Sequence, residues 1–476
     1  MKKISVAACV LLSACAVGPN YKAPVMAVPA RYKTDPGWVK AVPSDATPKG
    51  EWWVAFGDPT LNALEAQVAV NNASLAADYA AYEQAVALAE EAKGGLFPQI
   101  GVTGSAARND STVQGYSAGA KSSGTFEGTA SWTPDIWGKI RRQVEENTAA
   151  AQISAADLAN ARLSAEAALA SDYIDLRAAD ETIALYQQSV AAYQKSLTIV
   201  QNQYAAGIVP QSDVLSAQTL LDGAQAALIN LGASRAGYEH AIAVLTGHAP
   251  SEILIPAGPL MANVPVAPEA VPSELLQRRP DIAAAERNVA EQNAAIGVAV
   301  GAYYPDISLS ALAGYSADPI GGLFSASNTL WSLGVSAVGT LFDGGEKGYA
   351  VKAARFGYVE ALQNYRQTVL SAFQGVETDL SDLRVYGDET PVEERTVRDA
   401  QRAADIAMNE YEAGTVAYTA VVTAEVTALG DEQNAIVLKQ NRLLAAVALY
   451  QDLGGGFEAG DLPGAGKILA GVPVLP

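Results

Sequence analysis

Residues 143–206 read QVEENTAAAQISAADLANARLSAEAALASDYIDLRAADETIALYQQSVAAYQKSLTIVQNQYAA, and they predict the longest element of the protein. The stretch has 64 residues (206 − 143 + 1) and contains neither glycine nor proline, which most often interrupt a helix. At 1.5 Å per residue this helix is about 96 Å long, roughly three times the thickness of a bilayer core. Gly207 and Pro210 predict a tight turn, after which a second helix runs to Gly247.

The same pattern recurs 207 residues later in the chain (301 − 94 = 207). Glycine and proline are hard to replace, so their recurrence at one offset indicates shared turns, and we interpret the chain as a tandem duplication. In the second copy, Gly375, Gly387 and Pro391 interrupt the long helix, and we expect a kink or break there. The matching pairs include Gly94 and Gly301, Pro98 and Pro305, Ile100 and Ile307, Thr133 and Thr340, Gly138 and Gly345, Tyr204 and Tyr411, Gly207 and Gly414, and Gly247 and Gly454.

The N-terminus has the features of a secretion signal. Two lysines precede apolar residues 4–12, a stretch too short to span a bilayer. It ends in Leu12-Ser13-Ala14-Cys15, which resembles a bacterial lipobox and implies cleavage before Cys15 and acylation of that cysteine. Ala16 follows, rather than an aspartate that would suggest retention at the inner membrane. Because Cys9 is removed with the signal, we expect neither a disulfide nor a thiolate metal site.

Composition argues against several classes of function. A net charge of −20 disfavours nucleic acid as a partner, because phosphates require Lys and Arg to neutralise them. No later stretch has some 18 consecutive apolar residues, so no transmembrane helix is predicted. The only histidines are His240 and His248, and there is neither a Gly-rich phosphate loop nor a Cys/His cluster. We therefore expect no catalytic activity, no metal site and no cofactor other than the lipid on Cys15.

Apolar and polar residues alternate in four shorter segments, which we predict to be strands. Such segments of about ten residues are typical of transmembrane β-barrels, although a strand of a soluble sandwich alternates in the same way. The lipidated start and the aromatic residues near strand ends (Trp132, Tyr315 and Trp331) favour the membrane. The segments are 125–133, 307–314 and 331–341, with a weaker pattern at 99–106.

Four strands cannot close a barrel, since bacterial barrels begin at eight strands. An open edge in lipid would leave backbone groups unpaired, at several kcal/mol each. Several chains must therefore share one barrel: two chains would supply 8 strands and three would supply 12, enough to begin leaving a lumen. The predicted units are a signal peptide (1–14), a lipidated extended arm (15–60), repeat one (61–267, strand hairpin about 98–138, helical tip about 205–212), repeat two (268–456, strand hairpin about 305–345, helical tip about 412–419) and a tail (457–476).

Several motifs along nearly the whole chain match one known family. They are the run from Cys15 through Gly18-Pro19-Asn20-Tyr21 to Pro24, Trp52-Trp53 with Phe56-Gly57-Asp58-Pro59, Asp135-Ile136-Trp137-Gly138, Leu275-Leu276-Gln277-Arg278-Arg279-Pro280-Asp281-Ile282, Asn293-Ala294-Ala295-Ile296-Gly297, Tyr304-Pro305-Asp306-Ile307, Leu341-Phe342-Asp343-Gly344-Gly345 and Leu453-Gly454-Gly455-Gly456. The chain resembles the TolC-like outer membrane factors, in particular the lipoprotein branch of OprM and NodT type.

This resemblance implies an α+β membrane protein that forms a homotrimer. Four strands per chain would build a 12-stranded β-barrel in the outer membrane, and the long helices would build a 12-helix periplasmic barrel. The implied function is the passive, gated exit duct of a tripartite efflux pump for drugs, other small molecules or metal ions. The implied partners are a periplasmic adaptor, an inner-membrane transporter of RND type and outer-membrane lipids. Two alternatives are a duct for protein secretion and a helical envelope lipoprotein that acts only as a scaffold.

The resemblance also assigns candidate sites. The family's tip turns match Tyr204 with Gly207 and Tyr411 with Gly414, which implies contact with the adaptor. In TolC-type members, carboxylates after the second tip narrow the periplasmic aperture, but here those positions are Ala420 and Thr423. Asp213 occupies the position equivalent to Ala420 in repeat one (420 − 207 = 213). The candidate aperture residues are therefore Asp213, Tyr418, Ala420, Thr423 and Glu425.

Overall fold

The computed structural model describes most of the chain between residues 16 and 470. The predicted leader and Cys15 lie outside the described residues, and so does part of the Leu275–Ile282 motif. The described segments are 16–26, 50–110, 112–113, 116–117, 119–265 and 278–470.

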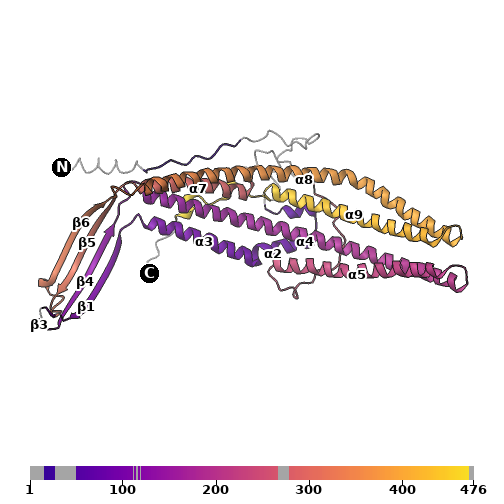
Figure 1. Ribbon diagram of the computed structural model, residues 1–476, viewed down its shortest axis with the longest axis horizontal. Coiled ribbons are helices and arrows are strands. Elements are labelled where there is room, and N and C mark those ends of the chain that lie inside the picture. Colours follow the sequence, from indigo (N-terminus) through magenta and orange to yellow (C-terminus); the bar gives the residue numbers. More distant parts are fainter. Residues whose placement is uncertain are drawn as a thin grey trace.

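Two helical hairpins lie side by side along the length of the molecule (Figure 1). The first is formed by α4 (Lys139–Ala205) and α5 (Gln211–Leu245), and the second by α8 (Glu346–Glu412) and α9 (Tyr418–Asp452). α4 and α8 each have 67 residues and are therefore about 100 Å long. α8 begins 207 residues after α4 (346 − 139 = 207), and α9 begins 207 residues after α5 (418 − 211 = 207). None of the described helices combines the length and apolarity needed to cross a bilayer.

Shorter helices connect the two halves into one body. α3 (Ala73–Gly94) packs on α4, whereas α7 (Pro280–Gly301) packs on both α8 and α4. α2 (Pro59–Asn71) precedes α3, and its N-terminus is capped by Asp58, whose carboxylate accepts hydrogen bonds from the backbone N–H groups of residues 60 and 61. The remaining short helices are η1 (Trp52–Phe56), η2 (Ala326–Asn328), η3 (Ala459–Asp461) and α10 (Ala465–Ile468).

A four-stranded antiparallel sheet projects from one end of the helices (Figure 1). Its order is β1-β4-β5-β6, so the pairing of β4 with β5 joins the two repeats. Among the described strands, β1 and β6 each have one edge without a partner. On β6, alternate residues Trp331, Leu333 and Val335 are exposed to 73–77%. The bounds are β1 (Gln99–Asn109), β4 (Lys121–Trp132), β5 (Asp306–Ala317) and β6 (Thr329–Val338), with a two-stranded ribbon of β2 (Thr112–Val113) and β3 (Tyr116–Ser117) at the far end.

α8 is one uninterrupted helix, so the predicted break is wrong. Pro391 lies inside it and cannot donate to the carbonyl four residues earlier, which belongs to Gly387. Gly387 has no side chain to crowd the proline ring, and Pro391 is exposed, so solvent can reach the freed carbonyl. Packing of α8 against α9 and α7 stabilises the helix on either side of the proline. Figure 1 shows α8 as a continuous, gently arched ribbon.

Gly375 has a different role, because it makes room for an ion pair. A Cβ at this position would overlap the carboxylate of Asp452 at the end of α9. Asp452 Oδ1 accepts a 2.8 Å hydrogen bond from Nη1 of Arg279, which lies at the start of α7. Arg279 also donates to Asp281, at 3.0 and 2.8 Å. The Arg279-Pro280-Asp281 motif therefore ties the beginning of repeat two to its end.

In repeat one a buried charge network holds the connector that follows α5. The carboxylate of Asp180 on α4 accepts hydrogen bonds from Nη1 of Arg177 at 3.2 Å and Nε of Arg235 at 2.6 Å. It also accepts one from the backbone N–H of Gly258 at 3.1 Å. The two arginines donate to the connector's carbonyls at residues 256 and 255, at 2.7 and 2.6 Å. The connector is thus fastened to both helices near the middle of the molecule.

The described part of the N-terminal arm, residues 16–26, lies over α4 and α7. Nε of Arg142 donates to the carbonyl of Val17 at 3.0 Å, and the amide of Asn293 donates to the carbonyl of Pro19 at 3.0 Å. A Cβ at Gly18 would meet the backbone of Gly297 at 2.5 Å, so the arm and α7 approach each other as closely as glycine allows.

Candidate functional site: the helical turns and the groove between them

Each long helical hairpin turns through a glycine in the left-handed region. Gly207 has φ 73° and Gly414 has φ 75°. The amide of Gly207 donates to the carbonyl of Tyr204 at 2.9 Å, and that of Gly414 donates to the carbonyl of Tyr411 at 2.9 Å. No heavy atom of the described chain lies within 4 Å of a Cβ built at either glycine. Within one chain, the backbone angle is therefore the reason for these glycines.

The two matching tyrosines differ in environment. Tyr204 is 46% exposed, whereas Tyr411 is 5% exposed. The ring of Tyr411 packs edge-on against the ring of Tyr418, with centroids 5.1 Å apart. Burial and the carboxylate of Asp213 raise the pKa of Tyr411, so Asp213 lies near the second turn as well as beside the first. The tips are thus alike in backbone and different in side-chain packing.

A buried cluster connects the two turns. It contains residues of both hairpins, so the first turn packs against the second through side chains and not only through neighbouring backbones. The hydroxyl groups of Tyr418 on α9 and Ser196 on α4 are 2.9 Å apart, within hydrogen-bonding distance. The buried members of the cluster are Tyr193, Leu197, Val200, Ala217, Leu221, Ala224, Tyr411, Tyr418 and Val421.

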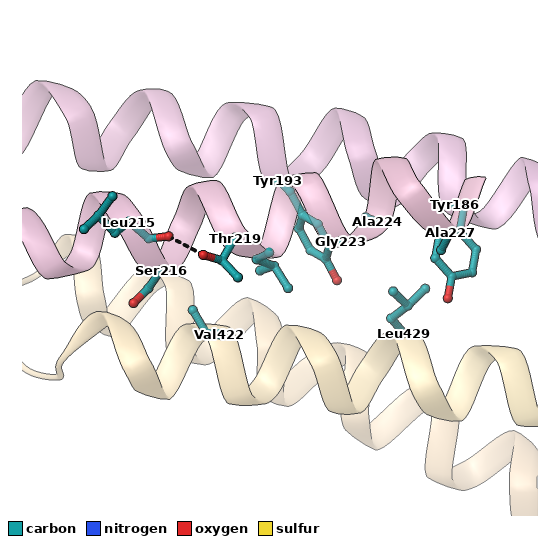
Figure 2. Close-up of a pocket in the computed structure, with 11 residues that line it drawn as sticks. Tyr186, Tyr193, Leu215, Ser216, Thr219, Gly223, Ala224, Ala227, Val422 and Leu429 are labelled. Atoms are coloured by element: carbon teal, nitrogen blue, oxygen red, sulfur yellow. Dashed lines mark hydrogen bonds between the residues drawn. The ribbon is translucent and has the colours of Figure 1, made fainter. Parts of the chain in front are cut away.

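An open groove of about 570 Å³ runs between the hairpins next to this cluster. Figure 2 shows its lining residues on the facing helices of the two hairpins, with Tyr186 and Tyr193 on one side and Val422 and Leu429 on the other. Most of the lining is apolar. The hydroxyl of Thr219 donates a 2.8 Å hydrogen bond to the helix carbonyl of Leu215. The complete lining is Tyr186, Tyr193, Leu215, Ser216, Thr219, Leu220, Gly223, Ala224, Ala227, Val422 and Leu429.

Glu425 lies partly buried where α9 meets α4. Its Oε2 is buried and has no hydrogen-bond partner among the described residues. Burial raises the pKa of this carboxyl to about 7. The hydroxyl of Tyr193 on α4 donates a 3.5 Å hydrogen bond to the backbone carbonyl of Glu425. Glu425 therefore faces the contact between the hairpins, where a charge is unfavourable.

The other candidate aperture residues occupy different surroundings. Tyr418 is 1% exposed and lies inside the protein, whereas Ala420 and Thr423 are exposed. The hydroxyl of Thr423 donates to the helix carbonyl of Thr419 at 2.8 Å. Asp213 is half-buried in the first turn of α5 and receives a 3.3 Å hydrogen bond from Ser212. The structure therefore brings Asp213 close to the turn of the other hairpin but separates Ala420 and Thr423 from the buried cluster.

Sequence reasoning did not identify Tyr193 and Ser196. Both lie in the interior of an unbroken helix, more than 220 residues from their partners Glu425 and Tyr418 (425 − 193 = 232; 418 − 196 = 222). The only signal in the sequence is that a tyrosine and a serine lie on the apolar face of the helix, which does not predict their partners on α9. Within the described part of the chain, no group of three or more His, Cys, Asp or Glu side chains is placed to hold a metal ion.

The model of the outer membrane efflux protein family matches residues 64–248 and 271–455. The chain belongs to the outer membrane efflux protein family. The two matched ranges begin 207 residues apart (271 − 64 = 207), so the family pattern occurs once in each repeat. The expected family is therefore confirmed.

Individual relatives resemble the chain over almost its full length. It is 28% identical over 469 residues to the pyoverdine export outer membrane protein OpmQ of Pseudomonas aeruginosa, which covers 96% of this chain and 98% of that protein. It is 26% identical over 470 residues to the cation efflux system protein CusC of Escherichia coli, covering 94% and 97%. The solved outer-membrane channel OprN has a TM-score of 0.83 at 28% identity, covering 93% of this chain and 99% of OprN.

Proposed function

We propose that this chain assembles as a homotrimer and forms the outer-membrane exit duct of a tripartite efflux pump. The observation that carries the proposal is the sheet at the end of the helical hairpins, whose outer strands β1 and β6 each have an edge without a partner among the described strands. Unpaired edges are unfavourable in lipid, and β6 presents alternate apolar side chains outward. Three copies pairing β6 with the next β1 would give 12 strands, enough to leave a lumen.

The helices would extend this tube into the periplasm. Each copy supplies α4, α5, α8 and α9, so three copies supply 12 helices in a barrel about 100 Å deep. Family membership and the likeness to the outer-membrane channel OprN support this arrangement. The tube is passive, and we assign it no enzymatic activity.

We further propose that Cys15 is acylated and anchors the N-terminal arm in the outer membrane. Several acyl chains together bind a bilayer firmly, at about 0.8 kcal/mol for each buried CH₂. The arm then crosses α4 and α7 through residues 16–26, which is a suitable position for a strap between lipid and helices. Mass spectrometry of the N-terminal peptide tests this, and an unmodified Cys15 in mature protein would contradict it.

The two helical turns would meet the periplasmic adaptor, the first with an exposed tyrosine and the second with its tyrosine, Tyr411, buried. Tyr204 and Gly207 form one turn, and Tyr411 and Gly414 form the other, at the end of the molecule opposite the sheet (Figure 1). An inner-membrane transporter, of RND type, would supply the energy and choose the cargo. OpmQ is named for pyoverdine export and CusC for cation efflux, which supports small molecules or metal ions as cargo.

The decisive experiment is to purify the full chain in detergent and measure its mass and its conductance in planar bilayers. A detergent-dependent trimer that conducts ions is expected, together with increased drug or metal susceptibility of a deletion strain. Co-purification then identifies the transporter. A protein without its lipid anchor that is monomeric and soluble in the absence of detergent would overturn the proposal.

A further inference from the structure

The contact between α4 and α9 near the turns contains an acid without a counter-charge. Glu425 Oε2 is buried and unpartnered within the described chain, and burial alone raises its pKa to about 7. Nearby, the hydroxyls of Tyr418 and Ser196 lie 2.9 Å apart, whereas the buried hydroxyl of Tyr411 also has no partner among the described residues. Of the two unpartnered groups, the Glu425 carboxyl is the one whose pKa lies near neutral pH.

The titratable groups recorded around Glu425 are all neutral or acidic. Its own helix α9 contributes Tyr418 and Glu432, and α4 contributes Tyr193, whose pKa is raised by burial and by the Glu425 and Glu432 carboxylates. Tyr186 on α4 acts on Tyr193, Asp213 on α5 acts on Tyr418, and Tyr418 and Asp213 both act on Tyr411 of α8. None of these described groups is basic, so within the described part of the chain they offer no cation to offset ionisation of Glu425.

The duplication gives a reference state for this position. The equivalent of Glu425 in repeat one is Gln218 (425 − 207 = 218), a neutral residue. Its amide donates to Asp222 Oδ1 at 2.8 Å on an exposed face of α5. One hairpin thus carries a permanently neutral side chain where the other carries an acid whose neutral form is favoured by burial.

We propose that the α4–α9 contact around Glu425 is a proton-dependent latch that holds the two helical turns of each chain together. A protonated carboxyl fits the contact as a neutral group. An ionised one requires water, which it gains when α9 separates from α4 and opens the groove lined by Tyr193 and Val422. The inference rests on the proposed function, because movement of these turns would change the width of the duct.

The direction of the effect follows from linkage. The folded contact binds the proton more tightly than an open, hydrated one, since burial raises the pKa of Glu425 to about 7. The contact is therefore most stable at acidic pH and weakens as the pH rises through about 7. The equilibrium between open and closed turns should shift by up to about tenfold per pH unit between the ordinary carboxyl value of 4.5 and about 7, and should level off on either side.

Hydrogen exchange of the full-length trimer in detergent, corrected for the intrinsic effect of pH, tests the latch between about pH 5.5 and 8.5. Amides of α4 around residue 193 and of α9 around residue 425 should lose protection as the pH rises. Glu425→Gln, which mimics the protonated acid, should remain protected throughout, and Glu425→Leu provides a second neutral variant. The matched control is Asp405→Asn, an exposed acid on α8 as far from residue 415 as Glu425 is (415 − 405 = 10; 425 − 415 = 10).

The second measurement is the conductance of the full-length protein in planar bilayers over the same pH range. The wild type should conduct more as the pH rises on the side of the turns, and Glu425→Gln should stay at the low-pH level. A Glu425→Gln variant that keeps the wild-type pH profile of exchange would overturn the latch, as would a wild type without one. A protein whose exchange follows pH but which conducts at no pH would refute the proposed duct while leaving the latch in place.

Discussion

The long helices of repeat two begin and end 207 residues after those of repeat one, but the charged side chains near the middle of the two hairpins differ. In repeat one, Asp180 lies between Arg177 and Arg235 and binds the connector through Gly258. In repeat two the equivalent arginines are present, but the acid is replaced by glycine. Arg384 and Arg442 form no ion pair or side-chain hydrogen bond with other described residues. The equivalent positions are Arg384 (177 + 207), Gly387 (180 + 207) and Arg442 (235 + 207).

The difference matches the different routes taken by the chain after each hairpin. After α5 the connector folds back onto the middle of α4 and α5, held by the Asp180 network. After α9 the chain passes along the base of the helices, where Ile468 packs against Ala89 and Ala151. The connector after α5 is thus held by the Asp180 carboxylate, whereas the equivalent position in the second hairpin is Gly387, which has no side chain to hold a connector.

A change at Asp180 should have the largest effect on this comparison. Asp180→Ala leaves two buried or half-buried guanidinium groups without their acceptor, so the free energy of unfolding should fall by about 3–5 kcal/mol. Chemical unfolding of the detergent-solubilised protein measures it. Asp388→Ala, which removes an exposed acid from α8, is the control and should change little. Equal effects of the two changes would show that the network does not hold the connector.

Glu65 is a second buried acid of repeat one that repeat two lacks. The equivalent position in repeat two, residue 272, is a proline (65 + 207 = 272). Glu65 is 1% exposed, and burial, followed by the nearby Glu166 carboxylate, raises its pKa to about 9. Because the folded state holds the proton more tightly, the wild type loses stability as pH rises towards 9. Glu65→Gln removes this loss, so between about pH 6 and 8 the variant should gain about 3 kcal/mol relative to wild type. Parallel pH dependences of wild type and variant would contradict the shift.

A change at Gly375 tests the close approach of α8 to the Asp452 carboxylate at the end of α9. Gly375→Ala places a methyl group against the Asp452 carboxylate that Arg279 holds, and should cost about 1–3 kcal/mol of unfolding free energy. Its equivalent in repeat one is the exposed Ala168 (375 − 207 = 168), and the residue equivalent to Asp452 is Leu245 (452 − 207 = 245), which is not an acid. Ala168→Gly, the reverse change, should cost only the helix preference of alanine, about 1 kcal/mol. A neutral or stabilising Gly375→Ala would exclude the steric explanation.

Restoring the missing acid in repeat two should give the smallest effect. A Cβ at Gly387 would lie 3.8 Å from Nη2 of Arg442, so Gly387→Asp should form a partly exposed ion pair and raise the unfolding free energy by up to about 1 kcal/mol. Gly387→Asn is the control without charge. If both variants unfold alike, and high salt changes neither, the charge difference between the repeats does not contribute to stability there.

The sequence predicted elements whose causes are local. The turn at Gly207 and its match at Gly414 could be read directly, because a left-handed residue between two long helical runs requires glycine. The strand alternation around Trp331 also predicted β6. Pro391 misled because helix breaking depends on more than proline: Gly387 and the flanking packing tolerate it, and packing is not visible in a local pattern.

The candidate site was predicted only in part. The turn residues Tyr411 and Gly414 follow from the repeat, whereas the burial of Tyr411 against Tyr418 and the contact of Ser196 with α9 do not. Identical backbone turns gave no indication that Tyr204 would be exposed and Tyr411 buried. Such differences depend on which neighbouring helix covers each tip.

The sequence by itself therefore predicted the long helices, their turns and the strand segments, because helix continuity, left-handed glycine and alternation depend on neighbours within a few residues. Only the tertiary structure decided which charges are buried and what they hold. Asp180, Glu65 and Glu425 are ordinary acids in the sequence. Their distinct roles come from helices that arrive from far along the chain, because desolvation and partner geometry exist only after packing.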